Sequence, residues 1–177
     1  MVNSTIFQIV GYQDSGKTTF VKKLIEQLKS VCINTVTIKH HGHGGKPVFN
    51  EEKDSYQHLQ AGALASIVEG DGHLLLQTEK SQWTLEEQIR LMSFFQPDVI
   101  LIEGHKYETY PKAIIIRKEE DLPLIKKLTN VKVVFYWDEQ LLASHKGLLE
   151  IPTFSINDPI GVKWMIEHLQ NNLKCKG

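Results

Sequence analysis

The chain has 177 residues, of which 41% are hydrophobic and 23% charged, and its formal net charge is −1. This length and composition are those of one globular domain with room for a buried core. A near-neutral charge gives no basic field for nucleic acid, and no apolar run approaches the roughly 20 residues of a membrane helix. We therefore expect neither nucleic acid nor a membrane as a partner.

Cysteine use and the first residues bear on the compartment. Cys32 and Cys175 lie far apart and lack the paired spacing of a metal site. A reducing environment explains them more simply than a structural disulfide. Residues 1–5 lack the basic start of a secretory signal. We expect a cytoplasmic protein with a single domain over residues 1–177.

The most informative motif follows the first predicted strand, residues 6–10. Residues 11–18 read GYQDSGKT, which matches the phosphate-loop pattern GxxxxGK[ST], and a helical pattern over residues 20–28 follows directly. A strand, a glycine-bearing loop and a helix in this order are the context that the motif needs. The sequence therefore predicts a P-loop domain that binds a nucleoside phosphate.

Each position of the loop has a chemical role. Two glycines let the backbone curl so that consecutive N–H groups point at phosphate oxygens, and the helix N-terminus adds partial positive charge. We expect Lys17 to reach the β- and γ-phosphates and the Thr18 hydroxyl to ligate Mg²⁺. Asp14 is placed to approach the γ-phosphate or a partner across an interface, and a solvent-facing acid is an equal alternative. The expected nucleotide-binding residues here are Gly11, Asp14, Ser15, Gly16, Lys17, Thr18 and Thr19.

Histidines follow the second predicted strand, residues 34–39. His40, His41 and His43 begin a glycine-bearing loop that extends to residue 53, and Lys39 ends the strand. We expect Lys39 and His40 to contact the nucleotide near the loop. A metal site is the alternative, although no clustered acids or cysteines complete a closed zinc set.

The middle of the chain contains a predicted hairpin between two helices. Asp54 precedes a helix over residues 55–62 and is interpreted both as its N-cap and as an outer Mg²⁺ ligand. Two apolar runs flank the turn sequence EGDG, which predicts a β-hairpin. A helix with apolar residues at helical spacing is expected over residues 84–95.

Glu103 is the second candidate Mg²⁺ ligand and catalytic group. It ends the apolar run VILI at residues 99–102, which is typical of a strand buried on both faces. Ligands of open α/β sheets bind at the carboxyl ends of such strands. Asp98, at the start of the strand, is expected at the opposite edge.

Further strands are predicted over residues 113–117, 131–137 and 153–156, with helices over residues 119–128 and 159–173. Alternating strands and helices predict a three-layer α/β P-loop NTPase domain, with a mostly parallel central sheet and a β-hairpin extension.

Base recognition is less defined. Asp138 follows a predicted strand, where a carboxylate accepts bonds from guanine or else caps a turn. Asn157 and Asp158 follow the next strand and are candidates for lining the same pocket, although capping of the last helix explains Asp158 equally well. The residues alone leave guanine against adenine open.

Several motifs together resemble the MobB family of molybdopterin-guanine dinucleotide biosynthesis adapter proteins. These are the phosphate loop, TIKHHGH at residues 37–43, KDSY at 53–56, AGA at 61–63 and LIEGHK at 101–106. The resemblance covers nearly the whole chain and is weakest in the last third. It departs at YWD, residues 136–138, where the family has a stretch of the Ala-Ser-Asp type.

The resemblance implies a GTP-binding, weakly hydrolysing protein that acts as a homodimer, through a hairpin that pairs the sheets of two subunits. It implies an adapter role beside the partner enzyme MobA, which attaches GMP from GTP to molybdopterin. GTP and Mg²⁺ are the implied ligands, and Lys17 and Glu103 match the catalytic positions. No glutamine or arginine is clearly placed to orient water, so we expect slow hydrolysis.

Two other functions are compatible with a P-loop. A small-molecule kinase usually has an arginine-rich lid, yet Arg90 and Arg117 are the chain's two arginines. The second alternative is a nickel- or zinc-insertion GTPase, and the three histidines after Lys39 are the only feature that supports it.

Overall fold

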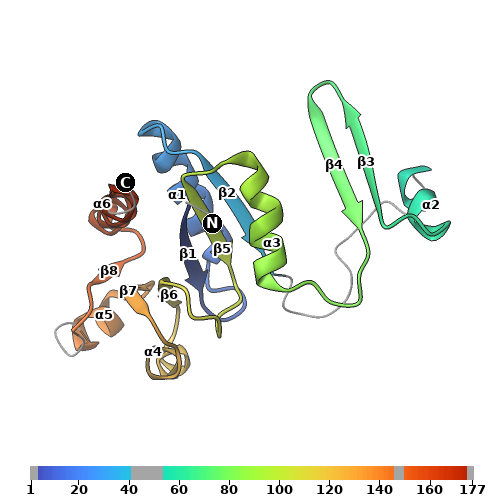
Figure 1. Ribbon diagram of the computed structural model, residues 1–177. Coiled ribbons are helices and arrows are strands. Elements are labelled where there is room, and N and C mark those ends of the chain that lie inside the picture. Colours follow the sequence, from blue (N-terminus) through green and yellow to red (C-terminus); the bar gives the residue numbers. More distant parts are fainter. Residues whose placement is uncertain (1–3, 41–53, 146–149, 175–177) are drawn as a thin grey trace. The chain divides into compact units, whose positions relative to one another are not determined.

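The computed structural model describes residues 4–40, 54–145 and 150–174 (Figure 1). The chain groups into two compact units. The first combines Met1–His40 with Leu85–Gly177, and the second is His41–Thr84. His41, His43 and most of the loop up to residue 53 lie outside the described residues.

The elements of the first unit are β1 (Thr5–Val10), α1 (Lys17–Ser30), β2 (Thr35–Lys39), α3 (Leu85–Met92), η1 (Ser93–Phe95), β5 (Val99–Glu103), β6 (Lys112–Ile116), η2 (Glu119–Asp121), α4 (Pro123–Lys127), β7 (Val131–Tyr136), α5 (Glu139–His145), β8 (Thr153–Ser155) and α6 (Pro159–Lys174). Those of the second unit are α2 (Asp54–Gln60), β3 (Ala65–Gly70) and β4 (His73–Thr78).

A six-stranded sheet in the order β2-β5-β1-β6-β7-β8 organises the first unit. All its neighbouring strands are parallel. β1 lies between β5 and β6, so the segment that leaves its carboxyl end emerges where the order of strands changes direction. Ligands of open α/β sheets bind at such a switch point.

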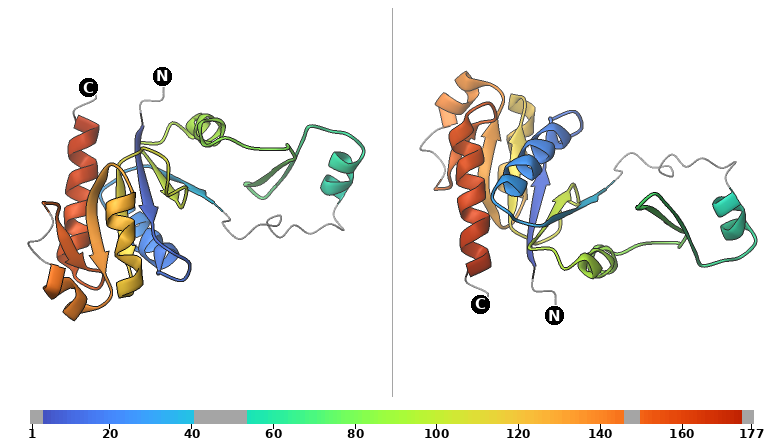
Figure 2. Two further views of the ribbon diagram at one scale, coloured as in Figure 1. Left: turned by 90° about the horizontal axis from the view of Figure 1, so that it is seen from below. Right: turned by 90° about the horizontal axis from the view of Figure 1, so that it is seen from above.

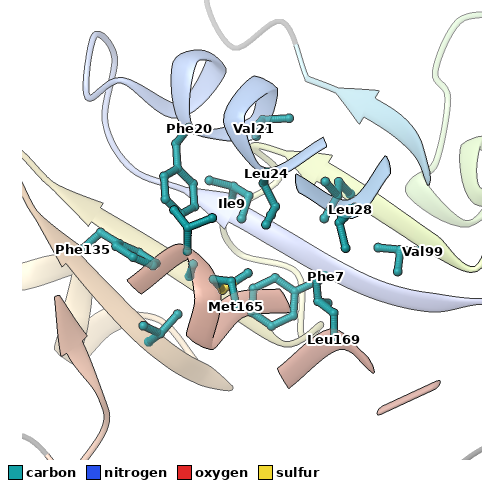
Figure 3. Packing of buried hydrophobic residues seen from close by; sticks show 14 of the residues in the cluster. Phe7, Ile9, Phe20, Val21, Leu24, Leu28, Val99, Phe135, Met165 and Leu169 are labelled. Atoms are coloured by element: carbon teal, nitrogen blue, oxygen red, sulfur yellow. The ribbon is translucent and has the colours of Figure 1, made fainter. Parts of the chain in front are cut away.

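Helices cover both faces of the sheet, which gives three layers (Figures 1 and 2). α1 and α6 pack on one face through a cluster that includes Phe7, Leu24 and Met165 (Figure 3). α3 and α4 cover the other face through two smaller clusters. β5 is buried at every position because it is central and covered on both sides.

The second unit is a hairpin with a short helix. β3 and β4 pair antiparallel, and Asp71 and Gly72 form the turn between them with φ of 50° and 75°. Positive φ at both central residues is typical of a type I′ turn, whose twist matches that of the two strands in a tight hairpin. On one face of the hairpin, the buried Ser66 and Gln77 adjoin α2, and Ser55 Oγ lies 3.0 Å from Gln77 Oε1.

These elements confirm the predicted α/β class with a mostly parallel sheet. The sequence did not predict α5, which begins directly after Asp138. The single helix expected over residues 119–128 is instead η2 followed by α4, with Pro123 at the first position of α4. Proline lacks the N–H that a continuous helix would use there, so the helix starts anew at it.

Candidate functional site

The phosphate loop lies between β1 and α1 and depends on its two glycines. A Cβ on Gly11 would lie 2.5 Å from Ser15 Oγ and 2.8 Å from the carbonyl oxygen of Ile115. Gly16 has φ of 85°, and a Cβ there would lie 2.6 Å from Cζ2 of Trp137. A larger residue at either position would force the loop or its neighbours to move, so the glycines fix its tight curvature.

The N-terminus of α1 is open to an anion. Gly16 is its N-cap, no side chain caps the amides that follow, and the first turn contains no acidic residue. The leading N–H groups of a helix have no partner within the helix, and the helix dipole favours negative charge beside them. The predicted phosphate site therefore has its donors in place.

Lys17 lies across the loop. Its Nζ donates to the carbonyl oxygen of Tyr12 at 2.5 Å and lies 3.5 Å from Ser15 Oγ. Burial holds the pKa of Lys17 below its ordinary value; the positive charges of Lys106 and Lys39 add to this effect, while Glu103 opposes it. The side chain therefore lies in a cluster of positive charge that a bound polyphosphate would neutralise.

The predicted pair Thr18 and Glu103 is brought together. Thr18 Oγ1 donates to Glu103 Oε1 at 2.7 Å, and Lys39 Nζ lies 3.0 Å from Thr18 Oγ1 and 3.1 Å from Glu103 Oε1. The Glu103 side chain is 10% exposed and that of Lys39 is 57% exposed. A hydroxyl and a carboxylate side by side, both directed at a cation, are oxygen ligands of the kind that Mg²⁺ takes.

The register of the sheet explains why these groups meet. Lys39 and Glu103 are Cα partners in the neighbouring strands β2 and β5, and Ile9 pairs with Glu103 from β1. Gln8, fully buried in β1, donates its side-chain amide to the carbonyl oxygens of Gly104 and His105 at 3.2 and 2.7 Å. This contact fixes the turn that follows Glu103.

Two histidine rings contact each other, tilted, beside this edge. The rings of His40 and His105 lie 4.4 Å apart between centroids, at an angle of 41°. Burial lowers the pKa of His105, and the neighbouring His40 lowers it further. His105 also has φ of 50°, which is uncommon for a residue with a side chain. His40 thus lies next to Glu103, whose backbone carbonyl oxygen accepts the His40 N–H at 2.9 Å, and its ring contacts another histidine. Its expected contact with the nucleotide stays a prediction.

Sequence reasoning missed two residues that hold the phosphate loop. Trp137, directly after β7, donates its indole N–H to the carbonyl oxygen of Ser15 at 2.8 Å and packs on Gly16. Arg117, after β6, donates to the carbonyl oxygen of Asp14. Both follow sheet strands at the carboxyl edge, which is the signal that could have identified them.

Lys106 is a third residue near the loop without a role in the sequence prediction. Its Nζ lies 4.6 Å from the ring centroid of Tyr12 and 5.7 Å from that of Tyr107. An ammonium over an aromatic face is attracted to the ring. The contact with Tyr12 keeps this positive charge beside the phosphate loop.

The remaining loop residues behave differently. The carboxylate of Asp14 belongs to an exposed residue with φ of 55°, Thr19 is also exposed, and Ser15 is 1% exposed with its hydroxyl against Gly11. Asp54 begins α2, and its side chain lies outside what the structure describes. The assignments of these residues to nucleotide or metal remain predictions.

Asp138 acts as a helix cap. Its Oδ1 accepts the backbone N–H groups of Gln140 and Leu141 at 2.7 and 3.1 Å, at the start of α5. Asp158 likewise accepts the N–H of Ile160 at 2.8 Å at the start of α6. The capping interpretation of both acids is present in the structure, and a guanine contact by Asp138 stays a prediction.

A cleft of about 670 Å³ lies beside these caps. It is lined by α5, including Glu139, by β8, and by Asn157 and Asp158. Asp138 is absent from its lining. Asn157 and Asp158 therefore line a cleft that does not include Asp138, so the pocket expected to join all three residues is not seen among the described residues.

Comparison with known proteins decides the family. The model of the family described as MobB, Molybdopterin guanine dinucleotide synthesis protein B, matches residues 6–136. This chain belongs to the MobB family. The resemblance drawn from the phosphate loop and from the Lys39 and Glu103 motifs is confirmed.

Relatives of the MobB family are similar over most of the chain. A probable molybdopterin-guanine dinucleotide biosynthesis adapter protein of Bacillus subtilis (strain 168) is 37% identical over 166 residues, which is 93% of both chains. A crystal structure of Bacillus subtilis MobB has a TM-score of 0.77 at 38% identity, covering 92% of this chain and 96% of that one. A MobB homologue from Bacillus stearothermophilus has a TM-score of 0.73 at 30% identity, covering 94% and 98%.

The P-loop of a MobB protein implies nucleotide binding, so this part of the sequence prediction stands. Within residues 4–40, 54–145 and 150–174, no three metal-binding side chains gather into a cluster. No described helix has the length and apolar character needed to cross a bilayer.

Proposed function

We propose that this MobB protein is a GTP-binding adapter with weak GTPase activity, which assists a MobA-like partner in attaching GMP to molybdopterin. The contact between Thr18 Oγ1 and Glu103 Oε1, 2.7 Å long at the mouth of the phosphate loop, carries this proposal. It joins the P-loop hydroxyl to the acid after the central strand, which is the arrangement that holds the metal of a nucleoside triphosphate.

Mg²⁺ fits the oxygen atoms at this edge. Thr18 and Glu103 would hold it, with Asp54 retained as a predicted outer ligand, and the ion would neutralise charge on the phosphates. Lys17 would offset the same charge from the other side of the loop. Asp14, Ser15, Thr19, Lys39 and His40 remain proposed nucleotide contacts, because they belong to the loop or to the edge beside it.

Hydrolysis by the chain alone should be slow. Arg117, the arginine nearest the loop, is bonded to the backbone carbonyl of Asp14 and therefore supports the loop rather than a reacting phosphate. Fast phosphoryl transfer depends on a group that positions the nucleophile or stabilises the transition state. We accordingly assign the nucleotidyl transfer to the partner enzyme and at most slow GTP hydrolysis to this chain.

A homodimer and a cytoplasmic location complete the proposal. On the hairpin face opposite α2, Ile67 and Leu74 are both 60% exposed, and Leu76 pairs with Ile67 across the strands. An isolated two-stranded hairpin is marginal in water and has unpaired edges. Pairing with the same hairpin of a second copy would cover these apolar side chains.

A reconstituted reaction tests the adapter role. Purified MobA-like nucleotidyltransferase, molybdopterin and limiting GTP are mixed with or without this chain, and molybdopterin-guanine dinucleotide is quantified by chromatography. The proposal predicts faster formation with the chain and no gain with Lys17→Ala, whose fold is verified by circular dichroism. An equal stimulation by both proteins would contradict a nucleotide-dependent adapter role.

A further inference from the structure

The ammonium group of Lys39 lies at the two oxygens that would hold a metal ion. Its Nζ is 3.0 Å from Thr18 Oγ1 and 3.1 Å from Glu103 Oε1. These oxygens are themselves 2.7 Å apart, so the three groups form a closed triangle of polar contacts. A positive charge in this position meets the same acceptors that Mg²⁺ would meet.

Other lysines of this edge make different contacts. Lys17 donates to the carbonyl oxygen of Tyr12, and Lys106 lies over the Tyr12 ring. Of these three lysines, Lys39 is the one that contacts both candidate metal ligands. Its position is therefore specific and is not explained by a general accumulation of positive charge.

The fold allows Lys39 to leave. β2 is the first strand of the sheet order and has a single neighbour, β5, and the Lys39 side chain is 57% exposed. Its long aliphatic stem can turn toward solvent without opening the core, whereas Glu103, at 10% exposed, is held in place.

We propose that Lys39 is an internal stand-in for Mg²⁺. Its ammonium neutralises Glu103 and orients the Thr18 hydroxyl until the metal enters with nucleotide, and it then yields this position. This inference rests on the proposed nucleotide site and adds a competition within that site. Because both cations use the same oxygens, binding of one reduces the affinity for the other.

The competition has a measurable consequence for nucleotide affinity. Without Mg²⁺, Lys39 supplies the cation beside the triphosphate, so affinity should fall only modestly when the metal is removed. Without the Lys39 charge, removal of Mg²⁺ leaves Glu103 unneutralised beside the phosphates. The ratio of triphosphate dissociation constants in EDTA and in saturating Mg²⁺ therefore reports the role of Lys39.

The experiment compares wild type, Lys39→Gln and Lys106→Gln in fluorescence titrations with a labelled GTP. We expect Lys39→Gln to raise the ratio by about tenfold, the size of one lost charge-assisted hydrogen bond, because affinity falls further in EDTA than in Mg²⁺. Lys106→Gln removes the same charge from the same edge and should weaken binding in both buffers equally. Both side chains are partly or largely exposed, and circular dichroism verifies the fold.

Three outcomes would overturn the inference. In the first, Lys39→Gln changes the ratio no more than Lys106→Gln does, so that a general field explains the effect. In the second, wild type binds in Mg²⁺ and loses all binding in EDTA. In the third, wild type fails to bind even with Mg²⁺; this result refutes the nucleotide site itself and is thereby distinguished from a failure confined to Lys39.

Discussion

The shape of the phosphate loop at residue 16 depends on the absence of a Cβ atom. The Trp137 ring occupies the space where a Cβ would project from Gly16, and the indole N–H is bonded to the carbonyl oxygen of Ser15. Trp137 therefore needs a glycine beneath it, and the loop in turn depends on a residue 122 positions away. Trp137 thus has a structural role at the phosphate loop.

Gly16→Ala should lower nucleotide affinity by at least about tenfold, because the new Cβ combines a left-handed backbone with a collision against Trp137. Titration calorimetry with GTP and Mg²⁺ measures the change. Gly72→Ala is the matched control, since Gly72 also has positive φ, at 75°, but has no neighbour within 4 Å of its added Cβ. The control should lose some stability and keep its affinity; equal losses of affinity would contradict the explanation.

His105 links stability to pH. Its pKa is lowered in the folded chain by burial and by His40, so the unfolded chain binds a proton more readily than the folded one below about pH 6.5. Its contribution is therefore present above that pH and is lost as pH falls through the lowered folded pKa.

His105→Asn should reduce the loss of unfolding free energy between pH 7.5 and pH 5, as measured by urea denaturation. Asparagine tolerates the left-handed backbone of this position, so the fold should be retained. A pH dependence identical to that of wild type would show that His105 does not supply this linkage.

At the scale of elements, most of the sheet could be predicted and one helix could not. β5 has four apolar residues followed by Glu103, and Gly104 comes next. The sequence therefore predicts both the burial of this strand and the ligand site at its carboxyl end. α5 is short, at seven residues, and Asp138, the cap that precedes it, also matches the acid expected to recognise a base. Local sequence alone does not separate these two roles, because both use the same carboxylate.

Substitutions of Asp138 separate the roles. Asp138→Ala should lower the unfolding free energy by about 1 kcal/mol, whereas Asp138→Asn should preserve it because asparagine also caps helices. If the side chain also recognises guanine, Asp138→Asn should reduce the preference for GTP over ATP, since an amide offers one acceptor fewer. Competition binding measures the preference; an unchanged ratio would leave capping as the role of Asp138.

The candidate site shows the same division. Gly11, Lys17, Thr18 and Glu103 were identifiable because the motif fixes their spacing and strand ends meet at one edge. Trp137 and Arg117 were not, because their contacts with the loop depend on the strand order beside β1: Arg117 follows its neighbour β6, and Trp137 follows β7, the next strand along. That order is a property of the whole sheet and is absent from any local pattern.

At the scale of the molecule, the hairpin unit presents apolar side chains that its own helix does not cover. Ile67 and Leu74 are each 60% exposed on one face, and Val68 and Leu75 on the other face are 46% and 48% exposed, beyond the buried Ser66 and Gln77. Folded proteins rarely leave several apolar side chains of one small element uncovered without a partner. These exposed side chains support the proposed pairing of two hairpins.

Ile67→Lys should convert a dimer to a monomer by placing a charge in the proposed apolar contact. Sedimentation equilibrium at several protein concentrations measures the mass. Gln57→Lys is a control on the exposed surface of α2, which adjoins the opposite face of the hairpin. A wild-type protein that is monomeric at all concentrations, or a variant that remains dimeric, would contradict hairpin pairing.

The most direct test of the central claim is equilibrium binding of GTP in the presence of Mg²⁺, measured by titration calorimetry for wild type and Lys17→Ala. Lys17 lies across the phosphate loop, so its loss should weaken binding by at least about tenfold, as expected for a charge-assisted contact. The account predicts stoichiometric binding by wild type and severe loss in the variant, with unchanged circular dichroism. Equal affinity in both proteins would contradict it.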